Sequence, residues 1–266
     1  MSKLLIRPEK GKQGRVIQVT PQSAGWTYVG FDLYRLQPGD TVSAETGERE
    51  VCLVFVTGRG TIHAAGTDLG SLGERMSPFE GKPWAVYAPQ SLDWSVTAET
   101  DLELAVCSAP GLGSGLAARV INPGDIGQET RGKGTNMRHV TNILPEGQPA
   151  DSLLVVEVIT PGGHTSSYPP HKHDQDNLPA ESYLEEIYYH RLNPPQGFAF
   201  QRVYTDDRSL DEAMAVEDGD VVLVPKGYHP CAACHGYDLY YLNVMAGPKR
   251  TWKFHNAAEH EWLMKA

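Results

Sequence analysis

The sequence has little positive charge and few cysteines. It contains 23 Lys and Arg against 33 Asp and Glu, which gives a formal net charge of -10 at pH 7. Such a chain lacks the positive field that draws proteins to nucleic acids or to anionic membranes, so we expect neither as a partner. The 4 cysteines of this long chain are typical of free thiols rather than of a disulfide framework. Small molecules are therefore the expected ligands.

Long hydrophobic runs and helical periodicity are also missing. No segment approaches the apolar length of a membrane-spanning helix, and residues 1–10 show no apolar stretch before a cleavage site. We therefore expect a cytoplasmic protein. Only residues 209–216 and 257–264 have a pattern that would support two helical turns.

What the sequence does contain is short apolar or alternating runs, separated by Gly and Pro. The 27 Gly and 19 Pro are spread along the 266 residues, which is typical of strand boundaries. We expect strands at residues 26–36, 51–56, 84–88, 102–106, 153–159, 198–204, 220–224 and 239–245. The predicted fold class is all-β.

Four segments recur in the same order in the two halves of the chain. The matched pairs are Leu36-Gln-Pro-Gly39 with Ile159-Thr-Pro-Gly162, Val86-Tyr-Ala-Pro89 with Val222-Leu-Val-Pro225, the apolar run after Glu50 with that after Glu186, and Asp101–Val106 with Asp238–Asn243. The spacing grows along the chain, and the polar segment 174–180 provides the extra loop. An ordered repeat of this kind indicates two copies of one β unit. We predict an N-terminal domain at 1–115, a linker at 116–134 and a C-terminal domain at 135–266.

The second copy carries a candidate metal site. His171 and His173 are two residues apart, so on a strand both imidazoles project from the same face. Glu186 begins the next apolar strand, and His229 follows a later one. Three imidazoles and a carboxylate would leave open positions on a transition metal, as catalytic sites require.

The first copy provides an internal comparison. The repeat places Glu48 and Glu50 near the positions of the first two histidines and Asp93 at that of the third. Since no histidine is left there, we predict that the N-terminal domain has no metal ligands.

These residues resemble the two motifs of the cupin superfamily. The first motif would consist of Gly163, His171, His173 and Glu186, and the second of Pro225, Gly227 and His229. The spacing departs from the superfamily pattern at the first glycine, before the glutamate and before the last histidine. Glu185 therefore stays an alternative to Glu186, and His235 stays an alternative to His229.

Longer strings resemble the 5-deoxy-glucuronate isomerase family of myo-inositol degradation. They are Ser167–Asp174, Glu185–His190, Asn193–Phe198, Gln201–Leu210, Val224–Pro230 and Tyr237–Gly247. The resemblance implies a bicupin, with two tandem cupin (double-stranded β-helix, or jelly-roll) barrels. It also implies an aldose–ketose isomerase that converts 5-deoxy-D-glucuronate into 5-dehydro-2-deoxy-D-gluconate. The related uronate ketol-isomerases use a His, His, Glu, His metal site.

A metal-assisted isomerase also needs a proton shuttle and a cation for the substrate carboxylate. Glu185, Tyr188, His190 and a hydroxide on the metal are the candidate bases. Arg202 is the first candidate for the carboxylate and Lys226 the second.

The remaining expectations concern the metal, the assembly and competing functions. We expect one divalent ion, Zn²⁺ in the first place, with Mn²⁺ or Fe²⁺ as alternatives. Exposed strand edges favour a homo-oligomer. The competing functions are a metal-dependent cupin dioxygenase and a sugar-binding cupin without catalysis.

Overall fold

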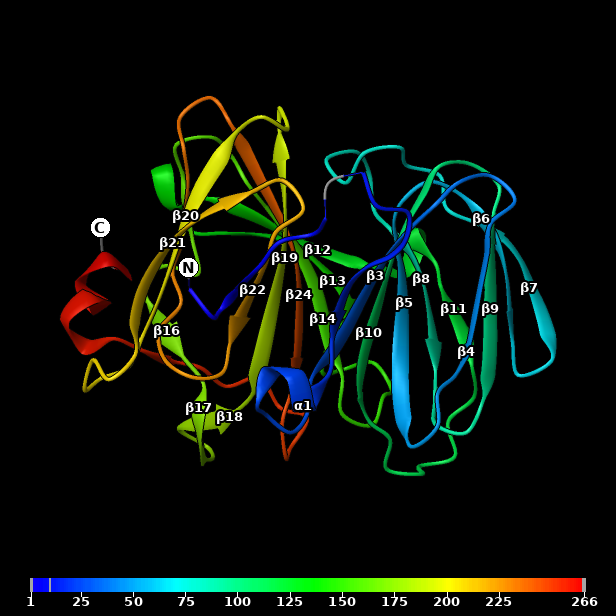
Figure 1. Ribbon diagram of the computed structural model, residues 1–266. Coiled ribbons are helices and arrows are strands. Elements are labelled where there is room, and N and C mark those ends of the chain that lie inside the picture. The colour runs from blue at the N-terminus through cyan, green and yellow to red at the C-terminus, as the bar shows by residue number, and fades with distance from the viewer. Residues whose placement is uncertain (1, 10, 265–266) are drawn as a thin grey trace. The chain divides into compact units, whose positions relative to one another are not determined.

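The computed structural model describes residues 2–9 and 11–264, and strands make up nearly all of its regular structure (Figure 1). The all-β fold class is thereby confirmed. The chain divides into two compact units. The C-terminal unit consists of Met1–Arg7, Gln128–Thr141 and Val156–Ala266, and the N-terminal unit consists of Pro8–Gly127 and Asn142–Val155. No helix of the described residues is both long enough and apolar enough to cross a membrane.

The strands that lie wholly or mostly in the C-terminal unit form a larger and a smaller sheet. The larger sheet has the order β1 (Leu5–Ile6), β22 (Val221–Val224), β19 (Glu185–Asn193), β24 (Asp238–Ala246), β14 (Leu154–Thr160), β13 (Arg138–Leu144) and β12 (Gly127–Arg131). The smaller sheet has the order β15 (Thr165–Ser166), β23 (Cys231–Ala233), β20 (Phe198–Tyr204) and β21 (Asp211–Glu217). Two further pairs are β16 (His171–Lys172) with β25 (His255–Asn256) and β17 (Asp174–Asn177) with β18 (Glu181–Tyr183).

The N-terminal unit has the same two-sheet design. Its larger sheet has the order β11 (Arg119–Ile121), β8 (Trp84–Ala88), β5 (Arg49–Thr57), β10 (Leu102–Pro110), β3 (Gly30–Leu36) and β2 (Gly14–Val19). Its smaller sheet has the order β4 (Thr41–Glu45), β9 (Asp93–Ala98), β6 (Gly60–Ala64) and β7 (Thr67–Leu72). The helical segments are short: α1 (Pro21–Ala24), and the 3-10 helices η1 (Pro123–Asp125), η2 (Gly134–Asn136) and η3 (Ala258–Met264).

The strand orders of the two units match, which confirms the repeat. The order β8-β5-β10-β3 corresponds to β22-β19-β24-β14, and β4-β9-β6-β7 corresponds to β15-β23-β20-β21. Each of the four segment pairs found in the sequence lies on, or at the end of, corresponding strands.

Every strand expected from the sequence is present, but the expectation of a helix at residues 209–216 is wrong. That segment forms β21, whose buried and exposed residues alternate along much of its length. The alternation has a period of two, which a strand with one face on the core requires. The segment 116–134, expected as a linker, contains β11 and β12.

The N-terminal unit contains a large apolar cluster. Leu53 and Phe55 of β5, Leu104 and Val106 of β10 and Trp94 of β9 are all buried in one hydrophobic cluster. Burial of such side chains contributes about 1.5–3 kcal/mol each, so this cluster stabilises the unit without providing polar groups for a ligand.

Candidate metal centre

Three imidazoles meet inside the C-terminal unit. The side chains of His171, His173 and His229 bring ligand atoms within 4.8 Å of one another. His171 lies on β16, His173 follows that strand, and His229 lies in the turn after β22. Within the described ranges, this is the only set of three such side chains close enough to share an ion. The described residues of the N-terminal unit contain no set of this kind.

Glu186 completes the cluster. Its Oε2 atom lies 2.9 Å from Nε2 of His173 and 3.0 Å from Nε2 of His229, and Nδ2 of Asn243 donates to its Oε1. Burial alone would raise the pKa of Glu186, but the imidazoles of His229 and His173 lower it well below its usual range. A buried carboxylate beside three imidazoles is thus held in the ionised form that binds metal.

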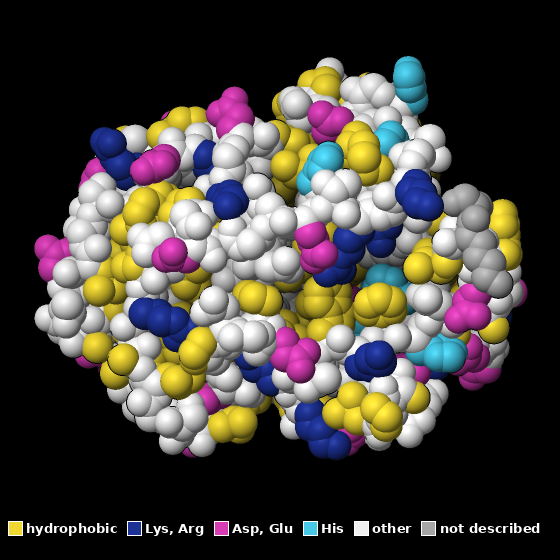
Figure 2. Space-filling model, turned by 180° about the vertical axis from the view of Figure 1, so that it is seen from behind, with side chains coloured by type: hydrophobic (Ala, Val, Ile, Leu, Met, Phe, Trp, Pro, Cys, Tyr) yellow, Lys and Arg dark blue, Asp and Glu magenta, His cyan; other side chains and the backbone are white. Residues whose placement is uncertain are grey.

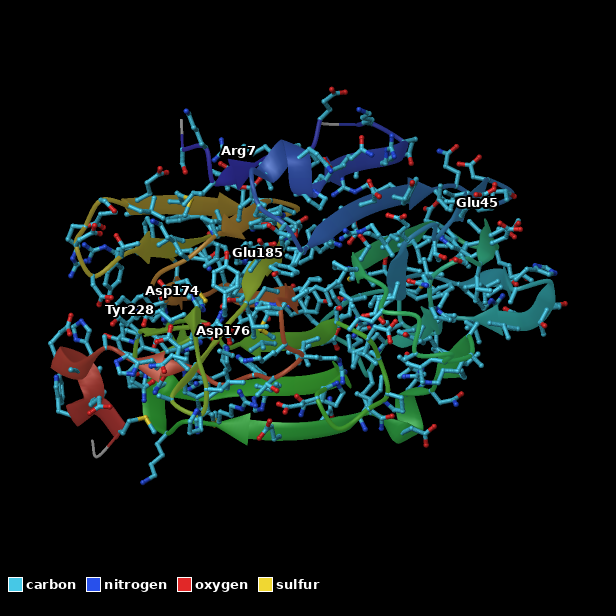
Figure 3. The ribbon with its side chains drawn as sticks, turned by 90° about the horizontal axis from the view of Figure 1, so that it is seen from below. Arg7, Glu45, Asp174, Asp176, Glu185 and Tyr228 are labelled. Atoms are coloured by element: carbon cyan, nitrogen blue, oxygen red, sulfur yellow. The ribbon has the colours of Figure 1, made fainter. Side chains whose placement is uncertain are left out.

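The sequence comparison aligned Glu50 with Glu186, but the strand pairing shifts this alignment by one residue. In the ladders, Val51 pairs with Ala88 as Glu186 pairs with Val224, so Glu185 occupies the position of Glu50. A shift of one residue moves a side chain to the opposite face of its strand. Figure 3 labels Glu185, which lies next to Glu186 on β19.

Backbone carbonyls orient two of the imidazoles. Nδ1 of His173 lies 3.0 Å from the Leu184 carbonyl oxygen, and Nδ1 of His229 lies 2.8 Å from that of Gly227. These contacts assign the proton to Nδ1 and turn Nε2 toward the cluster, as the second contacts of metal-binding histidines do. Nε2 of His229 is buried yet makes no hydrogen bond of good geometry. An unsatisfied buried nitrogen facing a carboxylate fits a divalent cation among these residues.

A cavity and a groove lead to the cluster. A cavity of about 30 Å³, enough for about one water molecule, is lined by residues that include His171, Glu186 and Tyr188. A groove of about 1130 Å³ shares His171, Arg131, Arg138 and Trp252 with it. Figure 2 shows basic and histidine side chains beside hydrophobic ones around a hollow. The groove is large enough for a small ligand to approach the three histidines.

Of the three candidate base residues, only Tyr188 lines the cavity. Its hydroxyl lies 2.8 Å from Oγ of Ser167, and burial is the main cause that raises its pKa well above the usual value. His190 is fully buried behind it, with Nε2 2.8 Å from Oε1 of Gln201, and burial lowers its pKa to about 4. Glu185 is buried and, by strand alternation, faces away from Glu186.

The structure does not bring either expected carboxylate-binding residue to the cluster. Arg202 lies on the exposed face of β20, where its guanidinium makes two 2.7 Å hydrogen bonds to Asp211. Lys226 is exposed as well, and neither side chain lines the cavity or the groove. The expectation that Arg202 points inward is wrong. Buried and exposed residues alternate along β20, and Arg202 occupies an exposed position.

Sequence reasoning missed two arginines that do line the cavity. Arg131 ends β12 and Arg138 begins β13, and the hairpin between them forms one wall of the groove. No motif marks them. Their only sequence signal is the run of Gly and polar residues at 132–136, which is typical of a turn.

Cys231 and Cys234, which follow His229 in the chain, are not among the clustered ligand side chains. Cys231 is buried in β23, where its Sγ contacts the Ser166 carbonyl oxygen, and Cys234 is partly buried. His235 is exposed. The geometry therefore favours His229 over His235 as the third imidazole.

Three comparisons with known proteins show the family and the fold of this chain. The sequence profile of the KduI/IolB family matches residues 4–263. A 5-deoxy-glucuronate isomerase from Geobacillus thermodenitrificans is 57% identical over 100% of this chain and 97% of its own length. The crystal structure of an IolB-like protein from Salmonella typhimurium has a TM-score of 0.96 and 56% identity, with 99% of this chain and 100% of that chain covered. An oxalate decarboxylase from Lactobacillus farciminis has a TM-score of 0.68 at 12% identity, with 100% and 91% covered, and shows the fold alone.

Proposed function

Because this chain belongs to the KduI/IolB family, we propose that it isomerises 5-deoxy-D-glucuronate to 5-dehydro-2-deoxy-D-gluconate. Its fold is a bicupin, and the C-terminal cupin contains the site. The observation that carries the proposal is the buried cluster of three imidazoles and one ionised carboxylate at the end of a groove of small-molecule size. We propose that this reaction is a step of myo-inositol degradation, as the resemblance to the isomerase family implies.

We propose that His171, His173, Glu186 and His229 hold one divalent ion. When bound, the ion supplies Lewis acidity, which makes the proton on the carbon next to the aldehyde more acidic. Imidazole and carboxylate donors suit Zn²⁺ first, and Mn²⁺ or Fe²⁺ also accept them. Asn243 holds Glu186 from the side away from the histidines and so fixes the direction of its free lone pairs.

The chain's own residues would handle the protons of the hydroxyl and carbonyl oxygens. The raised pKa keeps the Tyr188 hydroxyl protonated, so it acts as a hydrogen-bond donor rather than as a base. Its contact with Ser167 provides a second hydroxyl through which a proton can move along the cavity wall. Val140, Val156 and Val158 line the same cavity and limit the entry of water.

The proposal is tested with purified, metal-loaded protein and 5-deoxy-D-glucuronate under nitrogen. We expect conversion of aldose to ketose without oxygen, and one metal ion per chain by elemental analysis. His173→Ala should remove both the metal and the activity. Oxygen-dependent turnover would instead identify the dioxygenase, and binding without turnover would identify the sugar-binding cupin. Unchanged metal content in His173→Ala would overturn the ligand assignment.

We further propose a cytoplasmic homo-oligomer that acts on a small sugar acid and binds neither nucleic acid nor membrane. The net charge of -10 supports the last two points. Sedimentation of the purified protein tests the assembly, and a mass equal to one chain would contradict it.

A further inference from the structure

Inside the shared wall of the cavity and the groove lies a guanidinium without an acidic partner. Nη1 of Arg138 donates to the carbonyl oxygen of Asn136 at 3.1 Å and to its Oδ1 at 3.3 Å. Neither acceptor carries a charge. No carboxylate of the described residues pairs with Arg138, and its Nε and Nη2 donors make no hydrogen bond there.

The surroundings hold this guanidinium in place. Gly132 has φ +81, and the Cβ atom of any other residue at this position would lie 2.1 Å from the Asn136 carbonyl oxygen and 2.9 Å from Nη1 of Arg138. Only glycine allows the hairpin to fold so closely over the arginine. Nδ2 of Asn136 in turn donates to the Tyr168 carbonyl oxygen at 3.1 Å, which fixes the acceptor side of the contact. A fixed guanidinium loses little entropy when it binds a ligand.

The second arginine of this wall differs in its partners. Nη2 of Arg131 lies 2.6 Å from Oε1 of Glu129, and its guanidinium lies 5.2 Å from the ring centroid of Trp252. Its charge is therefore already compensated, and of the two arginines that line the cavity in the described part of the chain only Arg138 has no carboxylate partner.

We propose that Arg138 is the residue that binds the substrate's carboxylate and so selects a uronic acid over a neutral sugar. The free Nε and Nη2 edge of a guanidinium matches the two oxygens of a carboxylate, which accepts two parallel hydrogen bonds. His171 and Arg138 both line the groove, whose volume of about 1130 Å³ admits a six-carbon sugar acid, so one ligand can contact both residues. The positive charge of Arg138 is also among the causes that lower the pKa of His171, after burial and the other two histidines, which agrees with this closeness. The inference rests on the proposed function for the identity of the acid.

The test measures binding, so that it does not depend on turnover. The probes are borohydride-reduced 5-deoxy-D-glucuronate, which keeps the carboxylate but has no aldehyde, and the matching polyol with an alcohol at C6. Calorimetric titration of the metal-loaded protein should show that the wild type prefers the acid. Arg138→Gln should weaken binding of the acid by about 100-fold, as expected for the loss of two charge-assisted hydrogen bonds, and change polyol binding by less than about 3-fold. Arg138→Lys should retain the charge but lose about 10-fold, because an ammonium cannot make the paired contact.

The controls separate this role from a structural one. Arg202→Gln makes the same chemical change on an exposed strand face and should leave both affinities unchanged. Metal content should equal that of the wild type in every variant. Equal weakening of acid and polyol, an unchanged acid affinity in Arg138→Gln, or loss of the preference in Arg131→Gln instead would each overturn the assignment. If Arg138→Gln does not fold, Arg138→Lys decides, because an acid affinity equal to wild type in that variant also contradicts the paired contact.

The same samples keep the two proposals apart. Acid-selective binding that depends on Arg138, without turnover of the uronate, would refute the isomerase and leave the carboxylate subsite standing. If the wild type converts the uronate and the Arg138→Gln variant still prefers the acid to the polyol, the subsite is refuted and the isomerase proposal stands.

Discussion

The buried side chain of Lys172 should couple the stability of the C-terminal unit to its affinity for metal. Lys172 lies between His171 and His173 and projects from the opposite face of the chain, where Nζ lies 2.7 Å from Oδ2 of Asp206 and 3.1 Å from Oδ1 of Asp174. Oδ2 of Asp174 accepts the Gly227 N–H at 2.9 Å. The ammonium thereby connects the segment with two histidines to the turn that precedes the third.

The expected magnitude follows from the exposure of the partners. Removal of one member of a buried ion pair costs about 3–5 kcal/mol. The side chains of Lys172 and Asp174 are 5% and 12% exposed, but that of Asp206 is 64% exposed and contributes little. Tyr228, labelled with Asp174 in Figure 3, has its ring centroid 5.7 Å from Nζ of Lys172 but carries no charge that could replace the ammonium. We therefore expect Lys172→Met to lower the free energy of unfolding by about 2–3 kcal/mol, and the metal affinity by about 10- to 100-fold.

The assay combines urea unfolding of the metal-free protein with competition between the protein and a chelator for Zn²⁺. Lys249→Met is the matched control, because its Nζ also lies 3.1 Å from a carboxylate, that of Asp176, but the two side chains are 57% and 46% exposed. That pair should contribute less than about 1 kcal/mol and no metal affinity. Equal unfolding energies and equal Zn²⁺ affinities in the two variants would refute the coupling.

Three further predictions concern backbone, charge and thiol groups. Gly227→Ala should lower the free energy of unfolding by at least about 3 kcal/mol and weaken Zn²⁺ binding, because its Cβ would lie 2.4 Å from the Tyr204 carbonyl oxygen at φ +91. Gly236→Ala, at φ +87 in open space, should cost only about 1 kcal/mol, and similar urea midpoints for the two would contradict this. In Asp32→Asn, stability should exceed that of the wild type by about 2–3 kcal/mol above pH 6, because burial raises the pKa of Asp32 to about 6 in spite of an opposing arginine. The folded state then binds the proton more tightly than the unfolded state, so the gain should vanish as the pH falls below 4 in pH-dependent melting curves; a gain that does not change with pH would exclude the carboxyl as its source. Of the 4 cysteines, only Cys234 is not fully buried, so native protein should react with a thiol reagent at one site and unfolded protein at four; a second fast native thiol would contradict the burial.

Local sequence patterns were enough to predict the class of fold and the candidate ligands. Whether a short apolar run between Gly and Pro forms a strand depends mainly on its local pattern. All strands expected from the sequence are therefore present. His171 and His173 could be grouped because strand alternation is a local rule. The repeat was visible because corresponding strands in both units keep similar apolar segments.

The tertiary structure decided the questions that depend on register and on distant contacts. Glu186 rather than Glu185 faces the histidines because the ladder with β22 sets the parity of β19, and a slip of one residue reverses every side chain. On β20, which pairs with β21 and β23 in the smaller sheet, strand alternation likewise places Gln201 inside and Arg202 outside. Arg138 reaches the cavity only because β13 joins the sheet that carries Glu186. β13 pairs with its neighbours in the chain, β12 and β14, but Glu186 and Tyr241 of the same cavity come from β19 and β24, more than forty residues further along, so no local pattern near Arg138 predicts that they meet.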